Sequence, residues 1–213
     1  MTDGGSLRER LVDAGVDLVL AGGTASVGLR EIARRAGVSH GAPRRHFPTH
    51  DSLLSAIARR GFEDLHARFA TATATADAAA PRAQLAAAAR AYVGYALDHR
   101  GMFELMFRHD LLDGAPQGDG GPRLRETSLP LFGALVELVT RCRAEQDSAV
   151  VATAPPAPVT AAALWSNLHG LVQLWTWGSL QVVLGADDPG EESLRHEQLL
   201  TAVLDAHLGP VPA

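Results

Sequence analysis

The sequence predicts an all-α protein, and three observations support this fold class. The chain of 213 residues is 46% hydrophobic but only 5% aromatic, and it is rich in Ala and Leu. Its apolar residues recur at three- and four-residue steps, which is the spacing of one helix face. Few stretches alternate Val, Ile, Thr or Tyr with polar residues, as strands would. The lone cysteine, Cys142, excludes an intramolecular disulfide, and we interpret it as a core residue rather than a redox sensor.

The first seventy residues predict four helices. Apolar residues at helical spacing define a first helix over residues 7–22 and a second over residues 29–36. Gly37 ends the second helix, because glycine readily adopts the backbone conformation of a tight turn. A third helix begins at Ser39 or His40 and ends at His46, and a fourth runs from near Thr49 towards Phe69.

The stretch Thr71–Ala80 is low in complexity, with Thr and Ala that have little to pack, and it predicts a domain boundary. We therefore expect an N-terminal domain over residues 1–50, with a linking helix to about residue 70, and a second domain over residues 71–213. The further expected helices cover residues 81–99, 102–112, 124–145, 159–184 and 191–208, and the loops between them cover residues 114–122, 152–158 and 185–190.

Charge is distributed unevenly along the chain. The net charge is −5, which by itself argues against a nucleic-acid partner. Residues 30–60, however, hold seven Arg and three His against two acidic residues. A compact basic patch on an acidic protein is typical of a surface that contacts DNA.

The segment Leu29–Phe47 has the pattern of a helix-turn-helix. Small residues on the inner face of its first helix allow close packing, Gly37 supplies the turn, and Ser39 can cap the next helix. Gly41 and Ala42 are small enough to let the backbone approach base edges in the major groove. The alternative is an ordinary helical hairpin whose Arg residues face solvent. The turn glycine, the capping residue, the small residues and the basic cluster, however, all lie at the spacings of a helix-turn-helix, which favours DNA binding. Side chains that can then reach bases or phosphates are Arg44, Arg45 and His46.

At this point the sequence resembles the tetracycline-repressor (TetR) family of bacterial regulators over residues 7–65. A weaker resemblance links Leu164–Gly170 to a Trp…His-Gly signature found in a subset of family ligand domains. The residues that carry the first match are Leu29–Ala33, Ala36–Ser39, Gly41-Ala42, Arg45–Pro48 and Asp51–Leu54.

The resemblance implies a homodimer of about nine helices per chain, in which the last two helices form the interface and a C-terminal cavity binds an effector. The partners would be a double-stranded, palindromic DNA operator and a small apolar or aromatic molecule that releases it. No cofactor, metal or membrane is implied. The DNA-binding residues carried over are Arg30, Ser39, His40, Gly41, Ala42, Arg44, Arg45, His46 and His50, with His40, Gly41, Ala42 and Arg45 on bases and Arg44, His46 and His50 on the backbone.

Three positions depart from the family pattern. Gly28 replaces a Ser or Thr, so the second helix lacks a side-chain cap. Arg44 replaces a Tyr and keeps a phosphate donor while losing the ring. His50 replaces a Lys and is largely neutral at pH 7, so its backbone contact is weaker. Pro43 fits in the first turn of its helix, where it removes at most one backbone bond.

Five aromatic or imidazole side chains are candidates for the effector pocket: Phe103, Phe107, Trp165, His169 and Trp175. Phe103 and Phe107 are four residues apart on one helix face, as are Trp165 and His169, and aromatic rings beside a polar group suit an apolar ligand. Such residues at helical spacing are more often plain core than pocket.

Other readings remain open. The chain could be an activator, or a family member with weakened DNA binding. It could also be a small-molecule enzyme or carrier that uses His99, His109 and Asp110, although no nucleophile–base pattern or phosphate loop accompanies them. Val159–Ala186 lacks charges and is long enough to span a bilayer, but its polar residues favour a buried helix. The N-terminus predicts no secretion signal, and we expect a cytoplasmic protein.

Overall fold

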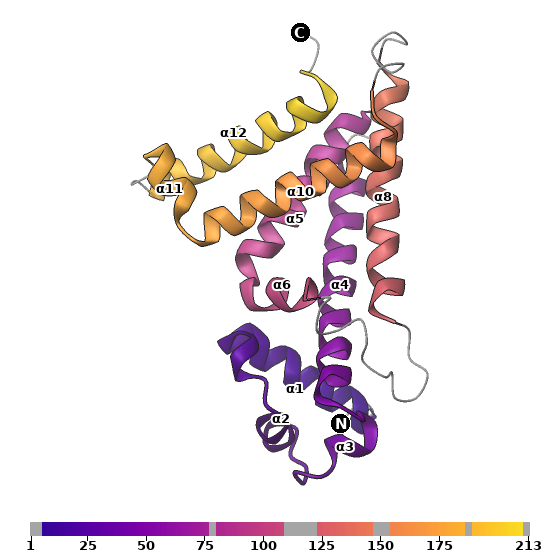
Figure 1. Cartoon of the computed structure of the whole chain (residues 1–213), viewed down its shortest axis with the longest axis vertical. Coiled ribbons are helices and arrows are strands. Elements are labelled where there is room, and N and C mark those ends of the chain that lie inside the picture. The colour runs from indigo at the N-terminus through magenta and orange to yellow at the C-terminus, as the bar shows by residue number, and fades with distance from the viewer. Residues whose placement is uncertain (1–5, 77–79, 109–122, 147–153, 186–188, 211–213) are drawn as a thin grey trace. The chain divides into compact units, whose positions relative to one another are not determined.

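The computed structural model describes residues 6–76, 80–108, 123–146, 154–185 and 189–210, and every regular element within them is helical (Figure 1). The predicted all-α fold class is therefore confirmed. The loop at 114–122, part of the linker at 152–158 and the pair His109-Asp110 lie outside the described residues. The helices are α1 (Leu7–Gly22), η1 (Thr24–Ser26, a 3₁₀ turn), α2 (Leu29–Arg35), α3 (Pro43–His46), α4 (His50–Thr75), α5 (Pro81–Asp98), α6 (Arg100–Met106), α8 (Leu124–Ala144), α10 (Ala157–Thr176), α11 (Ser179–Leu184) and α12 (Pro189–Leu208).

The chain divides into two compact units, and the division falls within α4 and α8 and before the last residue of α5. The first unit comprises residues 1–66 and 98–130, and the second comprises residues 67–97 and 131–213. The assignment of a DNA-binding role to residues 1–50 and of ligand and dimer roles to residues 71–213 remains a prediction.

In the first unit, α1 is fixed by its N-terminal cap and by close packing on α4. The Ser6 hydroxyl accepts a hydrogen bond from the Glu9 backbone N–H at 3.3 Å, and the Glu9 carboxylate accepts one from the Ser6 N–H at 2.7 Å. This capping box satisfies two amide groups that a helix start otherwise leaves unpaired. Gly15 faces Ile57, where a Cβ would lie 2.3 Å from Cδ1, so a larger residue here would require the Ile57 side chain to move.

The short helix α6 belongs to the same core. A Cβ on Gly101 would lie 2.7 Å from the Cα of Gly23 and 2.8 Å from the Val19 carbonyl oxygen, so α6 meets the backbone at the end of α1. Gly61 of α4 likewise leaves space for the Met106 side chain, whose sulfur would lie 2.6 Å from an added Cβ. Residues that are distant in sequence thus complete the core around the N-terminal helices.

In the second unit, α10 and α12 pack side by side, as Figure 1 also shows. Arg90 of α5 donates to Glu197 of α12 at 2.8 Å, and Arg82 donates to Asp205 at 2.5 Å. These two pairs hold α5 to α12 at separate points along both helices.

The prediction of one continuous helix over residues 159–184 is wrong, because the structure breaks this segment into two helices. Gly178 adopts a left-handed conformation with φ of 78°, and it separates α10 from α11. Helical periodicity continues through this position, but glycine allows the chain to turn where other residues would be strained. No helix in the described ranges is both long and apolar enough to cross a membrane.

Candidate nucleic-acid interface

The two ends of α2 are defined by glycines in different conformations. Gly28 caps the N-terminus in an extended conformation (φ −93°, ψ 142°) and, as predicted, makes no side-chain cap bond. Gly37 ends the helix with φ of 69°. Its N–H donates to the Arg34 carbonyl at 3.2 Å, and the Val38 N–H donates to the Ala33 carbonyl at 2.9 Å. These two bonds form a Schellman motif, which turns the chain sharply towards α3.

The helix α3 is shorter than predicted, and Ser39 does not cap it. Ala42 occupies the N-cap position without a side-chain bond, and Pro43 is the first helical residue. Proline suits this position because its fixed φ is helical and its missing N–H would have no partner there. The Ser39 carbonyl instead accepts a backbone bond from the Ala42 N–H at 2.9 Å, in the turn that leads into α3.

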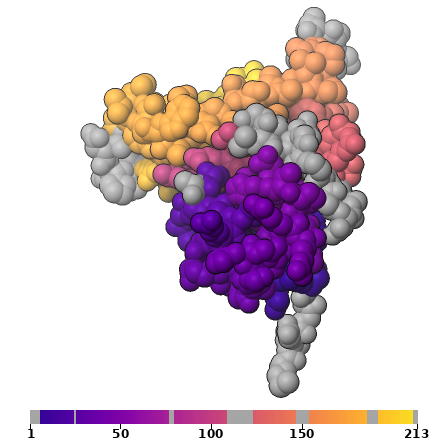
Figure 2. Space-filling model, turned by 60° about the horizontal axis from the view of Figure 1, so that its bottom comes forward, coloured from indigo at the N-terminus to yellow at the C-terminus, as the bar shows by residue number. Residues whose placement is uncertain are grey.

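The predicted DNA-contacting residues lie on α2, in the turn between α2 and α3, on α3 and at the start of α4, and none of them is fully buried. The N-terminal part of the chain, coloured indigo to purple, faces the viewer in Figure 2. Pro43 and Phe47 point inward and are buried, which anchors α3 to the core. The exposed residues among the predicted contacts are Arg30, Ser39, His40, Gly41, Arg44 and Arg45, while Ala42, His46 and His50 are half-buried.

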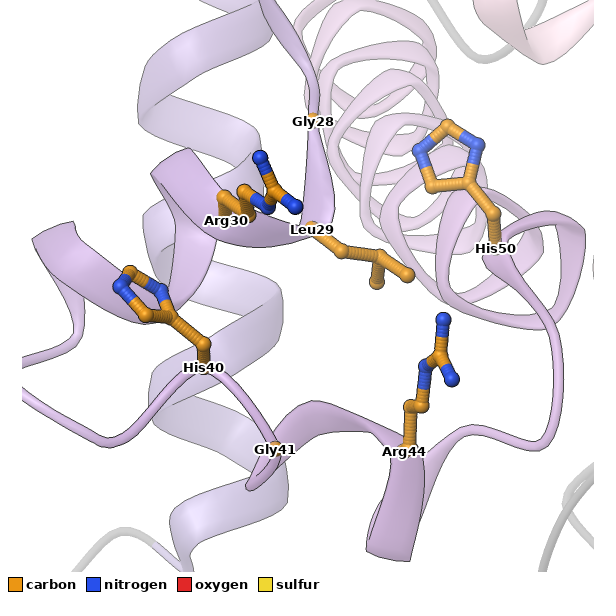
Figure 3. Close-up of a pocket in the computed structure, with 7 residues that line it drawn as sticks. All are labelled: Gly28, Leu29, Arg30, His40, Gly41, Arg44 and His50. Carbon is orange, nitrogen blue, oxygen red and sulfur yellow. The ribbon is translucent and has the colours of Figure 1, made fainter.

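A hollow of about 660 Å³ lies between α2, α3 and the start of α4 (Figure 3). Figure 3 shows the Arg44 side chain extending from α3 into this hollow, on the side where Leu29 and His50 lie. Two guanidinium groups beside an open concavity suit a phosphate or a base edge. Its lining residues are Gly28, Leu29, Arg30, His40, Gly41, Arg44 and His50.

The hollow brings together five of the nine predicted contact residues, and Ser39, Ala42, Arg45 and His46 do not line it. Leu29 was not predicted as a contact. Its position directly before Arg30 was the available signal, but periodicity assigned it to the helix core.

His50 has a structural bond that the sequence did not predict. Its Nε2 lies 2.7 Å from the carbonyl oxygen of Val27, so this nitrogen carries the proton and donates. Only Nδ1 then remains for DNA, and in the neutral ring it is an acceptor that cannot bind a phosphate oxygen. The α4 start itself is fixed by Thr49 and Ser52, whose hydroxyls each accept from the other's backbone N–H at 3.0 and 3.2 Å.

In the second unit, two of the pocket candidates form a polar cluster with Tyr92. The Trp165 indole N–H donates to the Tyr92 hydroxyl at 3.0 Å, and that hydroxyl lies 3.0 Å from Nδ1 of His169. Burial lowers the pKa of His169 and raises the pKa of Tyr92 above its usual range. The Nδ1 of the neutral imidazole therefore accepts a hydrogen bond from the Tyr92 hydroxyl, which keeps its proton. The sequence did not identify Tyr92 as a candidate, because its link to α10 depends on how α5 packs.

The other pocket candidates lie elsewhere. Trp175 is 2% exposed, and its indole N–H donates to Glu192 of α12 at 3.0 Å. Phe103 and Phe107 belong to the first unit, where Phe107 packs edge-on against Phe62 with ring centroids 5.5 Å apart. The five candidates are thus divided between the two units. Within the described part of the chain, no group of three His, Cys, Asp or Glu could hold a metal ion.

Comparison with known proteins finds two sequence families. Residues 11–57 match the model of bacterial regulatory proteins of the tetR family, and residues 85–207 match that of the tetracyclin repressor-like C-terminal domain. The narrower likeness of Leu164–Gly170 to a Trp…His-Gly subset remains a prediction. None of the curated proteins matches the chain.

Three solved structures are similar over nearly the whole chain. A protein of unknown function from Rhodococcus sp. RHA1 is 30% identical, with a TM-score of 0.73 and coverage of 96% of this chain and 95% of its own. The multidrug binding protein EbrR, complexed with imidazole, is 25% identical with a TM-score of 0.55, covering 99% and 98%. The TetR family regulator PfmR from Thermus thermophilus is 19% identical with a TM-score of 0.59, covering 96% and 100%, and it supports the fold alone.

Proposed function

The chain belongs to the TetR family of bacterial transcriptional regulators, and from this premise we propose that it represses transcription from a palindromic operator until a small molecule releases it. The observation that carries the DNA-binding part is the hollow formed by α2, α3 and the start of α4, whose basic residues face outward. The alternative is an activator with the same DNA-binding helices, since DNA contacts alone do not determine whether a regulator represses or activates transcription.

The two kinds of contact have separate roles in this proposal. Arg30 and Arg44 line the hollow and bind phosphates, which sets the position of the helix-turn-helix on the duplex. Arg45 is exposed on α3 but does not line the hollow, and it is the residue we assign to a base edge. An Arg fork can bind guanine O6 and N7 together, which distinguishes this base from the others.

A second copy of the chain is the proposed partner on α10 and α12. Large apolar side chains on these helices are exposed in the single chain, including Val159 at 54%, Leu174 at 41% and Leu194 at 59%. Pairing these faces in a two-fold dimer would remove them from water. The two helix-turn-helix segments of the dimer, about 34–36 Å apart, would then bind successive major grooves of an inverted repeat.

The proposed effector is a small apolar or aromatic molecule that binds in the second unit near Trp165 and His169. Phe132 packs edge-on against Trp165 with centroids 6.4 Å apart, which places a second ring beside the polar cluster with Tyr92. EbrR is described as a multidrug binding protein, and its likeness supports this class of ligand.

DNA binding is tested by a mobility-shift titration with the promoter beside the protein's own coding region. We expect saturable binding that weakens steeply with salt, because Arg–phosphate contacts release counterions. Arg45→Ala should cost about 1–3 kcal/mol on the operator and little on unrelated DNA. Arg34→Ala is the matched control, because Arg34 is exposed on α2 and its guanidinium pairs with Glu31 at 2.5 Å. Equal losses on both DNAs would reduce Arg45 to a phosphate contact.

The dimer is tested by sedimentation at micromolar concentration. Leu194→Glu should dissociate it, because a charge would then lie within the apolar contact of α12. A wild-type monomer would overturn this part of the proposal. The enzyme or carrier reading, which used His99, His109 and Asp110, gains no support from the family matches.

A further inference from the structure

A hydrogen bond joins the two ends of the helix-turn-helix. Nε2 of His50, the first residue of α4, donates to the carbonyl oxygen of Val27 at 2.7 Å. Val27 lies two positions before α2, so the bond spans 23 positions and encloses both α2 and α3. The hollow lies inside this closed segment, since its lining residues run from Gly28 to His50.

The accepting carbonyl belongs to a buried residue. Val27 is 3% exposed, so water has little access to its backbone. Its own N–H donates to the Thr24 carbonyl at 3.3 Å, which engages the nitrogen and leaves the oxygen for His50. A buried carbonyl that loses its partner costs free energy, because no hydrogen bond to water replaces the lost one. The imidazole thus contributes to fixing the residue that leads into α2.

The start of α2 lacks a side-chain cap, which makes this bond more important. Gly28 occupies the N-cap position without a side-chain hydrogen bond, and glycine gives the backbone more conformational freedom than other residues. The helix is seven residues long, and a helix of that length is not stable by itself. Its second residue is Arg30, which lines the hollow. The position of Arg30 therefore depends on how firmly Val27 and Gly28 are held.

We propose that His50 is a positioning residue for DNA binding, which fixes the start of α2 and thereby places Arg30 against a phosphate. The proposal rests on the DNA-binding role of the hollow given above. Figure 3 shows the His50 ring on the same side of the hollow as Gly28, with Arg44 across from them. His50 thus supplies from α4 the constraint that a Ser or Thr at position 28 would supply locally.

Direct contact between His50 and a phosphate is the competing role, and Arg30 distinguishes the two. A direct contact contributes independently of Arg30, so the losses from removing each side chain would add. A positioning residue acts through Arg30, so its removal costs little once Arg30 is absent. Double-mutant cycles measure this difference.

The first test measures the affinity of the full chain for the promoter fragment in a mobility-shift titration. His50→Ala should weaken binding by roughly threefold to tenfold, because one buried hydrogen bond is lost. His50→Gln should keep most of the affinity, because an amide N–H can donate to the same carbonyl. In an Arg30→Ala chain, His50→Ala should cost less than about twofold.

Arg34→Ala is the matched control background, because Arg34 lies on the same helix and does not line the hollow. In this background His50→Ala should retain its full cost. A full cost in the Arg30→Ala chain as well would make His50 a direct phosphate contact and overturn the proposal.

Gly28→Ser tests the proposed compensation. Gly28 has the extended backbone of an N-cap, and an added Cβ would meet no atom within 4 Å, so serine fits there and can cap α2. It should strengthen promoter binding more in the His50→Ala chain than in the wild type. An equal gain in both chains would show that the two residues act independently and would overturn the proposal.

Hydrogen exchange of the free chain tests the same bond without DNA. Amides of α2 should exchange faster in His50→Ala than in the wild type, and Gly28→Ser should slow them again, while those of α5 stay unchanged. Unchanged exchange in α2 would overturn the proposal even if the wild type binds the promoter. Faster exchange with unchanged promoter affinity would overturn the role in DNA binding. A wild type that does not bind the promoter would instead contradict the proposed function.

Discussion

Replacing either of the glycines at the two ends of α2 by serine should change the free energy of unfolding, but in opposite directions at the two positions. Gly28 and Gly37 are alike in that an added Cβ would meet no atom within 4 Å at either position. They differ in backbone conformation, since φ is −93° at Gly28 and 69° at Gly37. Steric clash is thereby excluded, and the comparison isolates the effect of the backbone.

The expected magnitudes follow from that difference. In Gly28→Ser, the hydroxyl can accept an orphan N–H of α2, which contributes a few tenths of a kcal/mol relative to glycine. The restricted unfolded chain contributes about 0.4–1 kcal/mol more. In Gly37→Ser, the left-handed conformation costs roughly 1–2 kcal/mol and exceeds the same gain in the unfolded state. We therefore expect about 0.6–1.4 kcal/mol of stabilisation at Gly28 and a loss of up to about 1.6 kcal/mol at Gly37.

The assay is urea unfolding of the full chain, followed by circular dichroism at the helical band. Tryptophan fluorescence would report on the wrong part, because Trp165, Trp175 and Trp177 all belong to the second unit. Shifts of the same sign in the two variants would refute the reasoning, because they would show that something other than φ dominates at these positions.

Two further predictions concern packing and pH. Gly101→Ala should destabilise the fold by about 1–3 kcal/mol, because its Cβ would lie 2.7 Å from the Cα of Gly23. Thermal unfolding measures this, and Gly94→Ala is the control, because that helical site has open space and should gain up to about 1 kcal/mol. Burial lowers the pKa of His169 below its ordinary value of 6.5, so the unfolded chain binds this proton more readily and stability falls as pH drops through 6.5. His169→Gln should make the loss of urea stability between about pH 7.5 and 5.5 shallower, and an unchanged slope would contradict neutral His169 as the acceptor of the Tyr92 hydroxyl.

Much of the N-terminal architecture could be predicted from the sequence because local signals define it. The Gly22-Gly23 and Gly37 helix ends lie where glycine was expected to stop a helix, and α4 begins one residue after Thr49. The start of α3 could not be predicted in the same way. Ser39 is a good capping residue, yet Pro43 four positions later is an equally good first helical residue, and local propensity does not choose between them.

The effector half of the sequence was less predictable, because its signals are ambiguous. Aromatic residues at helical spacing describe a core and a pocket equally well, and the structure distributes the five candidates over both units. The break at Gly178 was also missed, since a single glycine within an apolar run is compatible with a continuous helix.

The sequence by itself determined the helix class, the helix end at Gly37 and the basic segment around α2 and α3, because each depends on residues within a few positions of one another. Only the tertiary structure decided that Tyr92 joins Trp165 to His169, that α6 meets the end of α1, and that His50 bonds to the Val27 carbonyl. A hydrogen bond depends on distances of a few ångströms. Between helices that are remote in sequence, packing alone determines such distances.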